Sequence, residues 1–276
     1  MPTVLYVTDL TYQAKGRRYC DEDIALSAAL RAESGGGFEA VLCHPLDAAA
    51  LMGRFDLTVV RNSGPVLGYR EAYEAFRERA LAEGVKVFNP LHGRGDMAGK
   101  QYLLDLSAAG YPVIPTVASR DGLGRLPDAA VYLSKPLLGA DSIGIALHRP
   151  EELGALELDG TVLLQPRIDF RYEVSFYYVG REFQYALYAP DPAARWRLER
   201  YDPSPSDLAF ARRFVEWNAL DHGIQRVDAC RTPEGGLLLV ELEDLNPFLS
   251  LDLLDAAARA SFTTAMAASM RSLLES

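Results

Sequence analysis

The sequence has few cysteines and no long apolar run, and both absences narrow the class of protein. Its three cysteines match no zinc-binding spacing, and such a sparse, odd number is typical of a protein from a reducing compartment. No apolar run approaches the roughly 20 residues of a membrane span, and the first residues lack the basic and apolar regions of a signal peptide. We therefore expect a cytoplasmic protein without a membrane partner.

The chain also lacks an excess of positive charge. Its formal net charge is −10, which argues against nucleic acid as the main partner. Histidine is scarce, and its four widely scattered positions suggest structural roles and no Ser/His/Asp or Cys/His catalytic set. The hydrophobic share of 49% is ordinary for a globular protein, and 276 residues suffice for two or three small lobes.

Short apolar segments alternate with helical segments over roughly the first ninety residues. This alternation predicts a parallel, Rossmann-like sheet in a domain over residues 1–95. The expected strands are 4–7, 40–43, 57–60 and 85–88, and the expected helices are 23–32 and 69–83. Ligands of such sheets lie beyond the carboxyl ends of the strands. Asp9–Arg18 and Asn62–Gly68 are therefore expected to line a substrate pocket. Arg17 and Arg18, or the segment that begins at Arg61, could hold a carboxylate there, and a solvated loop is the equal alternative in both places.

The remainder of the chain predicts two lobes of mixed helices and strands, over residues 96–160 and 161–276, so the fold class is α/β with α+β lobes. The central lobe is expected to begin with a helix over 97–109, and the third lobe with a strand over 162–165. Further expected elements are strands at 113–114, 131–135, 174–179 and 182–188, and helices at 151–156, 207–220 and 253–274. Pro190–Pro205 is expected to be a mobile loop.

Carboxylates gather near the end of the chain. Asp228 and Glu241 lie thirteen positions apart and are joined by a Gly235-Gly236 turn, which predicts a β-hairpin that presents both side chains to one place. Carboxylates facing an apolar strand are costly to desolvate, and a hard divalent cation offsets that cost. Mg²⁺ with ATP phosphates is the usual reason for such a cluster, so we expect an ATP-using enzyme.

Three cations are candidates for contact with phosphate. Lys135 ends an apolar strand and precedes the small-residue loop Gly139–Gly144, whose backbone could approach phosphate oxygens. Arg226 shares a strand face with Asp228, where it could stabilise a transferring phosphoryl group or form a simple ion pair. Lys100 lies in the expected helix 97–109, and a solvated surface charge is the simpler interpretation of any single lysine.

Two other positions offer weaker signals. Gln165 ends a strand before Pro166 and could accept from an adenine amino group, while Ile168 could offer its backbone; an ordinary strand end is the simpler interpretation. Glu173 lies within a strand-like segment, where alternation could place it on the solvated face.

In this order, the residues resemble the ATP-grasp superfamily, with a pattern similar to D-alanine–D-alanine ligase and glutathione synthetase. The resemblance runs from about Asp96 to Leu251, and it implies an ATP-grasp fold after the N-terminal domain. It implies that Lys100, Lys135 and the glycine-rich loop with Gly139, Ser142 and Gly144 hold ATP phosphates. The implied adenine and ribose contacts are Gln165, Ile168 and Glu173, and the implied phosphoryl-stabilising arginine and metal ligands are Arg226, Asp228 and Glu241.

One departure concerns the last metal position, where the family normally has Glu-x-Asn. Here Glu241-Leu242-Glu243 precedes Asn246, so either Glu243 replaces the asparagine or an insertion makes Asn246 the match. Strand parity places Glu241 and Glu243 on one face, which favours Glu243.

The resemblance implies an ATP-dependent carboxylate–amine ligase that forms an acylphosphate and releases ADP and phosphate. It implies two Mg²⁺ ions, with Mn²⁺ as a substitute, an amino acid or peptide substrate, and a homodimer. Within the loop 190–205, Arg197 is the candidate for a cation that reaches the phosphates, and a solvated loop is the equal alternative. A kinase on the same lobes and a non-catalytic nucleotide-binding regulator stay open.

Overall fold

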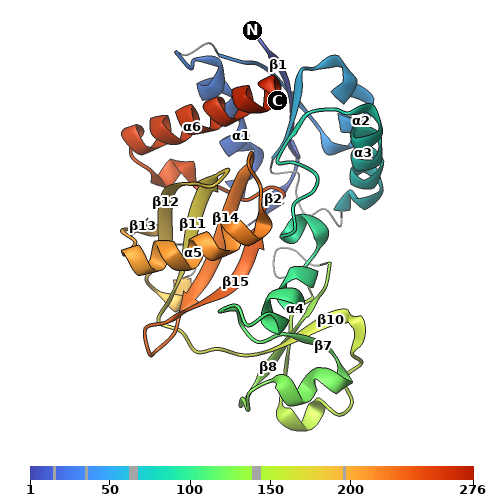
Figure 1. Cartoon of the computed structure of the whole chain (residues 1–276), viewed down its shortest axis with the longest axis vertical. Helices are drawn as coiled ribbons and strands as arrows, with labels where there is room; N and C mark the ends of the chain where they lie inside the picture. Colours follow the sequence, from blue (N-terminus) through green and yellow to red (C-terminus); the bar gives the residue numbers. More distant parts are fainter. Residues whose placement is uncertain (15–16, 35–36, 62–67, 139–143, 195–196) are drawn as a thin grey trace.

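The computed structural model describes residues 1–276 except 15–16, 35–36, 62–67, 139–143 and 195–196. Three sheets of four, four and five strands, with helices packed on them, follow one another along the molecule, and a two-stranded hairpin pairs β2 (Gln13–Ala14) with β3 (Arg17–Arg18). In Figure 1 the N-terminal sheet lies at the top, the five-stranded sheet lies in the middle, and the sheet of the central lobe lies at the bottom. The division into domains 1–95, 96–160 and 161–276 stays a prediction.

The N-terminal sheet is fully parallel, as the sequence predicted, with the strand order β4-β1-β5-β6. Its strands are β1 (Thr3–Val7), β4 (Glu39–Cys43), β5 (Leu57–Val60) and β6 (Val87–Phe88). Its helices are α1 (Cys20–Arg31), α2 (Ala48–Leu51) and α3 (Arg70–Glu83). Gly84 ends α3 in the left-handed conformation (φ 65°), which glycine adopts without steric cost.

The central sheet has the order β7-β10-β8-β9, and its strands are antiparallel. They are β7 (Val117–Ser119), β8 (Tyr132–Pro136), β9 (Ala146–His148) and β10 (Asp159–Pro166). The prediction that the strand at 162–165 begins the third lobe is therefore wrong. This strand is β10, which pairs with β8 from Val162 to Pro166 and belongs to the central sheet.

The C-terminal sheet has the order β13-β12-β11-β14-β15, with every neighbouring pair antiparallel. Its strands are β11 (Tyr172–Val179), β12 (Glu182–Ala189), β13 (Glu199–Tyr201), β14 (Ile224–Arg231) and β15 (Leu237–Glu243). Helix α5 (Pro205–Asn218) packs its Phe210 and Phe214 into the core with Phe176 and Val227 of the sheet. The expected loop 190–205 thus contains a strand, β13, at one edge of the sheet.

The last helix packs against both the N-terminal and the C-terminal sheets. Helix α6 (Ala256–Glu275) begins at Asp255, whose side chain caps the Ala258 amide at 2.8 Å. Its Phe262 and Met266 share a core with Tyr6 of β1 and Tyr185 of β12. The N-terminal sheet and the C-terminal sheet are therefore packed against the same helix, as Figure 1 also shows.

The helix expected over 97–109 is interrupted. A 3₁₀ turn (Asp96–Ala98) precedes helix α4 (Gln101–Ala108), and Gly99 between them has a φ of 82°. The expected helix at 151–156 is likewise a 3₁₀ turn (Pro150–Glu152), and the expected strand at 113–114 is a single parallel bridge from Val113 to Leu239. These segments are shaped by tertiary contacts, which sequence periodicity does not reveal.

Gly95 should not tolerate a side chain. A Cβ atom there would lie 2.7 Å from the Leu242 carbonyl oxygen, which belongs to the backbone of β15 and cannot turn away. We expect Gly95→Ala to lower the free energy of unfolding by about 1–3 kcal/mol, as overpacking usually does. Gly124→Ala is the matched control, because nothing lies within 4 Å of its added Cβ. Urea denaturation of both variants measures the difference; equal stability would contradict this packing.

Candidate active site

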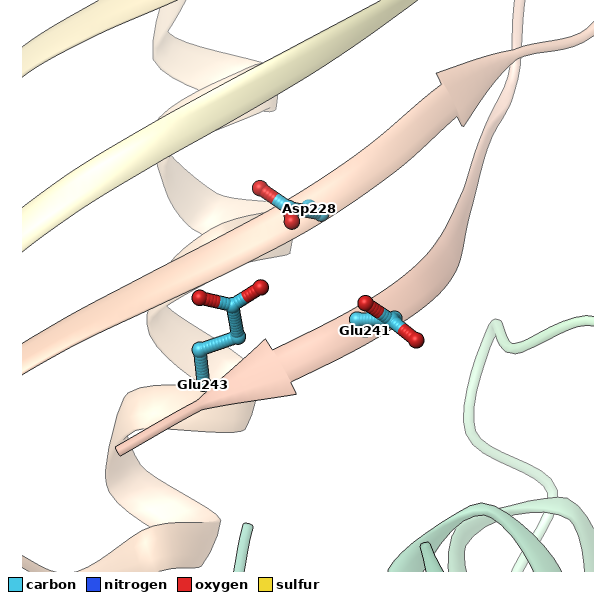
Figure 2. A group of neighbouring side chains, drawn as sticks. All are labelled: Asp228, Glu241 and Glu243. Carbon is cyan, nitrogen blue, oxygen red and sulfur yellow. The ribbon is translucent and has the colours of Figure 1, made fainter. Parts of the chain in front are cut away.

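Three carboxylates meet on one face of the β14–β15 hairpin. The register places Asp228 opposite Glu241, and Arg226 opposite Glu243. One oxygen from each of Asp228, Glu241 and Glu243 lies within 4.8 Å of the others, and we call these three residues the acid cluster. Figure 2 shows the Glu243 carboxyl group directed toward the strand that carries Asp228. The hairpin geometry expected from the sequence is thus present, while the role of these residues as metal ligands stays a prediction.

The next carboxylate, Asp244, lies outside the acid cluster and accepts hydrogen bonds from other parts of the chain. Its buried side chain accepts hydrogen bonds from the Gly95 amide at 2.8 Å, the Met97 amide at 2.9 Å and the Asn218 side chain at 2.9 Å. In return, Asp96 accepts the amide hydrogen bond of Asp244 at 2.7 Å. These contacts fasten the start of the central lobe to the end of β15. The alternative in which Asn246 is the last metal ligand is not tested by this arrangement, and Asn246 is half-buried.

Arg226 neutralises part of the acid cluster. Its guanidinium holds Asp228 through two nitrogens, at 2.9 and 2.8 Å, and also pairs with Glu243. Burial raises the pKa of the Glu243 carboxyl to about 8, and the neighbouring charges of Asp228 and Glu241 add to that rise against the opposing effect of Arg226. The crowding of three buried carboxyl groups therefore favours the protonated form of Glu243.

Two buried ammonium groups face the same cluster. Lys100 forms an ion pair with Glu241 at 2.5 Å. Lys135 is 6% exposed, and burial lowers its pKa to about 8; the charge of Glu241 opposes this shift, and that of Lys100 adds to it. Both lysines thus interact with Glu241 and with each other. Neither is the solvated surface charge that the sequence left open.

Strand β8 explains why these two lysines are neighbours. Lys135 lies in β8, opposite Leu163 of β10. The chain continues to Leu137, whose carbonyl accepts the backbone amide of Lys100 at 2.9 Å. Lys100 is thereby fixed at the first turn of α4, beside the strand that carries Lys135. This contact joins segments that are 37 positions apart, so no local pattern predicts it.

The residues predicted to contact adenine and ribose lie on or between strands that adjoin those carrying Lys135 and Asp228. Gln165 is buried on the same face of the central sheet as Lys135, and its amide nitrogen donates to the Thr116 hydroxyl at 2.8 Å. Ile168 is half-buried in the segment between β10 and β11. Glu173 lies in β11, two positions before Ser175, which pairs with Asp228; Glu173 therefore shares the sheet face of the acid cluster. Their contacts with nucleotide stay predictions.

The glycine-rich loop is described only at its end. Gly139 and Ser142 lie outside the described residues. Gly144 has a φ of 77°, and an added Cβ would lie 2.8 Å from a ring carbon of Pro136 at the end of β8. A glycine is therefore needed where this loop returns to the sheet.

The structure does not bring every predicted residue to the acid cluster. Arg197 is exposed just before β13, at the sheet edge opposite β15, and four strand spacings amount to roughly 19 Å. Its role stays a prediction. Arg61 was expected to be available for a substrate carboxylate, and this expectation is wrong. Its guanidinium is fully buried and is paired with Asp23 and Glu22.

Sequence reasoning missed an aromatic group beside Arg226. The Phe248 carbonyl accepts from Arg226 at 2.9 Å, and the Phe248 ring lies 5.0 Å from Tyr19. Tyr19 in turn meets Tyr12 edge to face at 5.2 Å. All three rings are half-buried. Part of the signal was present, because Tyr12 falls within the expected pocket segment Asp9–Arg18 and Tyr19 directly follows it.

Magnesium and a nucleotide fit this set of groups. Carboxylate oxygens are the ligands that Mg²⁺ prefers, and the acid cluster offers three of them within a short span. Lys100 and Lys135 supply positive charge on the side of Glu241, where phosphates would need it. The Arg226 guanidinium forms ion pairs with two of the three carboxylates, so the cluster already binds one positively charged group.

These features define the class. The chain has the ATP-grasp fold, so the fold that the motifs implied is confirmed. No protein-family model matches it. In sequence, it is 26% identical to the cycloserine biosynthesis protein DcsG of Streptomyces lavendulae over 252 residues, covering 78% of this chain and 84% of that protein.

Solved structures agree over nearly the full length. The crystal structure of D-cycloserine synthetase DcsG matches with a TM-score of 0.72 and 23% identity, covering 95% of this chain and 98% of that one. D-alanine–D-alanine ligase from Bacillus anthracis, complexed with ATP, matches with a TM-score of 0.67 and 13% identity, covering 100% of this chain and 99% of that one. The ATP-grasp ligase PsnB, complexed with a precursor variant, Mg and ADP, matches with a TM-score of 0.63 and 14% identity, covering 96% of this chain and 98% of that one. Within the described residues, no helix has the length and apolar character of a membrane span.

Nucleotide affinity should depend on pH through Lys135. Its pKa of about 8 means that the ammonium loses its proton within an accessible range. Bound phosphates favour the charged form and raise this pKa, so affinity is fully present below about pH 8 and is lost as pH rises above it. We expect ADP affinity, measured by calorimetry in EDTA, to fall by up to about tenfold per pH unit there.

Lys135→Arg is the control for this titration, because arginine stays charged over the whole range. The variant should bind ADP with little dependence on pH between neutral and alkaline conditions. A decline of the same steepness in both proteins would show that another group causes it.

Proposed function

We propose that the chain is an ATP-dependent ligase that joins the carboxylate of an amino acid or peptide to an amine. One observation carries this proposal: the acid cluster of one lobe and the two buried lysines of the other meet at Glu241. The similarity to DcsG, and the likeness in fold to D-alanine–D-alanine ligase and PsnB, support the same class of reaction.

Each group has a role in this mechanism. Lys100 and Lys135 hold the phosphates, while Gln165, Ile168 and Glu173 hold adenine and ribose. Asp228, Glu241 and Glu243 would hold Mg²⁺, with two ions as the expected number and Mn²⁺ as a substitute. Bound metal would neutralise part of the charge of the phosphates. The present pairing of Arg226 with two members of the cluster supports its placement beside the reacting phosphoryl group.

The reaction then proceeds in two steps. A carboxylate oxygen of the substrate attacks the terminal phosphorus of ATP, and ADP leaves. The amine nitrogen attacks the acyl carbon of the resulting acylphosphate, inorganic phosphate leaves, and the nitrogen loses its proton. Arg226 stabilises the negative charge that develops on the phosphoryl and acyl oxygens. No side-chain nucleophile is required.

The substrate would lie between the acid cluster and the N-terminal domain. Tyr12, Tyr19 and Phe248 give this side an aromatic wall, and Phe248 connects it directly to Arg226. Half-buried aromatic faces suit a small organic substrate. We place the amino acid or peptide at this wall, with its carboxylate directed toward Arg226.

A second candidate is ring closure within one molecule that carries both the carboxylate and the nitrogen nucleophile. The sequence similarity to DcsG favours it, because that protein is named a D-cycloserine synthetase. The two candidates differ in stoichiometry. Ring closure consumes one substrate per ADP, whereas ligation consumes two.

A screen of ADP release tests both candidates. Amino-acid derivatives are supplied singly and in pairs, with ATP and Mg²⁺, and hydroxylamine is added to trap the acylphosphate as a hydroxamate. Ligation predicts ADP release that needs both a carboxylate and an amine, and a hydroxamate when hydroxylamine takes the place of the amine. Ring closure predicts ADP release with a single substrate that carries both groups. ADP release with a hydroxyl substrate and no hydroxamate would identify a kinase. Tight ATP binding without turnover of any mixture would favour a non-catalytic regulator. A homodimer, which we also propose, is tested by sedimentation.

A further inference from the structure

The loop that follows β15 packs Leu249 and Leu251 into the core, and its backbone is also held by hydrogen bonds. Five of its backbone polar groups bond to four side chains, from α1, the end of β5, β12 and β14. We call residues 247–251 the anchor loop. Its contacts are the Pro247 carbonyl with Arg61 (2.8 Å), the Phe248 carbonyl with Arg226 (2.9 Å), the Leu249 amide with Glu22 (2.8 Å), the Leu249 carbonyl with Tyr185 (2.8 Å) and the Leu251 amide with Glu22 (3.0 Å).

Glu22 at the start of α1 makes two of these contacts. One carboxylate oxygen accepts from the Leu249 amide, and the other accepts from the Leu251 amide. Ser250, between those amides, has a φ of 52°, a left-handed conformation that is unfavourable for a non-glycine residue. The loop keeps this conformation because both oxygens of Glu22 hold it from either side.

Arg61 at the end of β5 makes a third contact and fixes Glu22 at the same time. Its fully buried guanidinium binds Asp23 at 3.2 Å, Glu22 at 3.3 Å and the Pro247 carbonyl at 2.8 Å. Asp23 is held in turn by the Thr8 hydroxyl at 2.7 Å. A buried group with three directed partners has little freedom to turn, so the N-terminal domain sets the position of the anchor loop.

On its other side, the anchor loop holds Arg226. That guanidinium has two kinds of partner: the carboxylates of Asp228 and Glu243, and the Phe248 carbonyl. A cation bound by the acid cluster competes with Arg226 for the carboxylate oxygens. It does not compete for the Phe248 carbonyl, which is therefore the contact that can keep Arg226 oriented when metal and nucleotide are present.

We propose that Glu22 and Arg61 are positioning residues that orient Arg226 for phosphoryl transfer by holding the anchor loop. This inference rests on the proposed function, in which Arg226 stabilises the transferring group. It assigns to the N-terminal domain a part in the chemistry besides the binding of substrate. A merely structural pair would support folding and leave the turnover of the folded enzyme unchanged.

Glu22→Gln tests the proposal. Glutamine keeps the size of the side chain and one acceptor oxygen, but its amide nitrogen cannot accept the second amide hydrogen bond. We expect kcat to fall about 10- to 100-fold, since a misplacement of roughly 1 Å has effects of this size. KM for ATP should change less than about twofold, because Lys100 and Lys135 are untouched. Asp21→Asn is the matched control: it lies one position away, is exposed, and should retain wild-type kcat.

A second readout needs no turnover. The side-chain Nε–H signal of Arg226, assigned by its loss in Arg226→Lys, is recorded by NMR in the complex with Mg²⁺ and ADP. We expect a sharp signal in the wild type and in Asp21→Asn, and a shifted or broadened signal in Glu22→Gln. Should Glu22→Gln fail to fold, Arg61→Lys gives the same comparison, because lysine keeps the charge but lacks the planar fork that reaches three partners.

The outcomes separate the two claims. A folded Glu22→Gln with wild-type kcat and an unchanged Arg226 signal overturns the positioning role. A wild type that turns over no substrate overturns the proposed function instead, and the NMR comparison then still decides whether Glu22 orients Arg226. A lower melting temperature with unaltered kcat and signal means that Glu22 and Arg61 serve folding alone.

Discussion

Replacing Asp228 by asparagine is expected to lower ATP turnover by about a thousandfold, while the protein stays folded. Asp228 lies at the centre of the acid cluster, opposite Glu241 and bonded to Arg226. Asparagine keeps the shape of the side chain but removes the charge that Mg²⁺ requires. Stability should change little, because Arg226 keeps its contact with Glu243 and the removal of one acidic group relieves the crowding within the cluster.

The measurement is ADP release at saturating Mg²⁺, together with the melting temperature. Glu234→Gln is the matched control, since it removes a negative charge from the exposed turn of the same hairpin. The control should retain full turnover. Near-normal turnover in Asp228→Asn would mean that the acid cluster does not bind the catalytic metal, and the proposed mechanism would fail.

Arg226→Lys should give the second largest effect. Lysine keeps the positive charge but cannot hold Asp228, Glu243 and the Phe248 carbonyl together, as the planar guanidinium does. We expect kcat to fall by about 10²–10³, the usual loss when one stabilising donor is removed. The affinity for Mg²⁺ and ADP should stay within about threefold of the wild type, because the charge of the site is conserved.

Single-turnover kinetics and calorimetry separate these two quantities. Arg212→Lys, an exposed position on α5, serves as the control and should behave as the wild type does. If Arg226→Lys instead lost nucleotide affinity and kept kcat, Arg226 would be a binding residue that does not act on the transition state. The positioning role of Glu22 and Arg61 would then lose its basis as well.

Periodicity in the sequence predicted the parts of the fold that local patterns control. Alternating strands and helices predicted the parallel N-terminal sheet, and Gly84 marked the end of α3. Strand parity placed Glu241 and Glu243 on one face, and both belong to the acid cluster. These inferences succeeded because each depends on residues within one strand or one hairpin.

Other features depend on contacts between distant segments, and the sequence could not reveal them. The register of β10 on β8 moves that strand into the central sheet. The Leu137 carbonyl fixes Lys100, and Asp244 fastens residues 95–97, so the helix expected over 97–109 breaks at Gly99. The positions of Lys100 and Lys135 in the sequence do not show that the end of β8 will contact the start of α4.

The interpretation of Arg61 failed for the same reason. An arginine after a parallel strand is well placed for a substrate carboxylate, and no local pattern pairs it with acids that lie 38 and 39 positions earlier. In the fold, Glu22 and Asp23 reach Arg61 and remove it from solvent. The pairing turns a candidate substrate residue into a support for the anchor loop.

The most direct test is a crystal structure of the protein with Mg²⁺ and a non-hydrolysable ATP analogue. We expect metal bound by oxygens of Asp228 and Glu241 at about 2.1 Å, and phosphate oxygens within hydrogen-bonding distance of Lys100 and Lys135. A nucleotide bound elsewhere, with the acid cluster still closed on Arg226 alone, would contradict it.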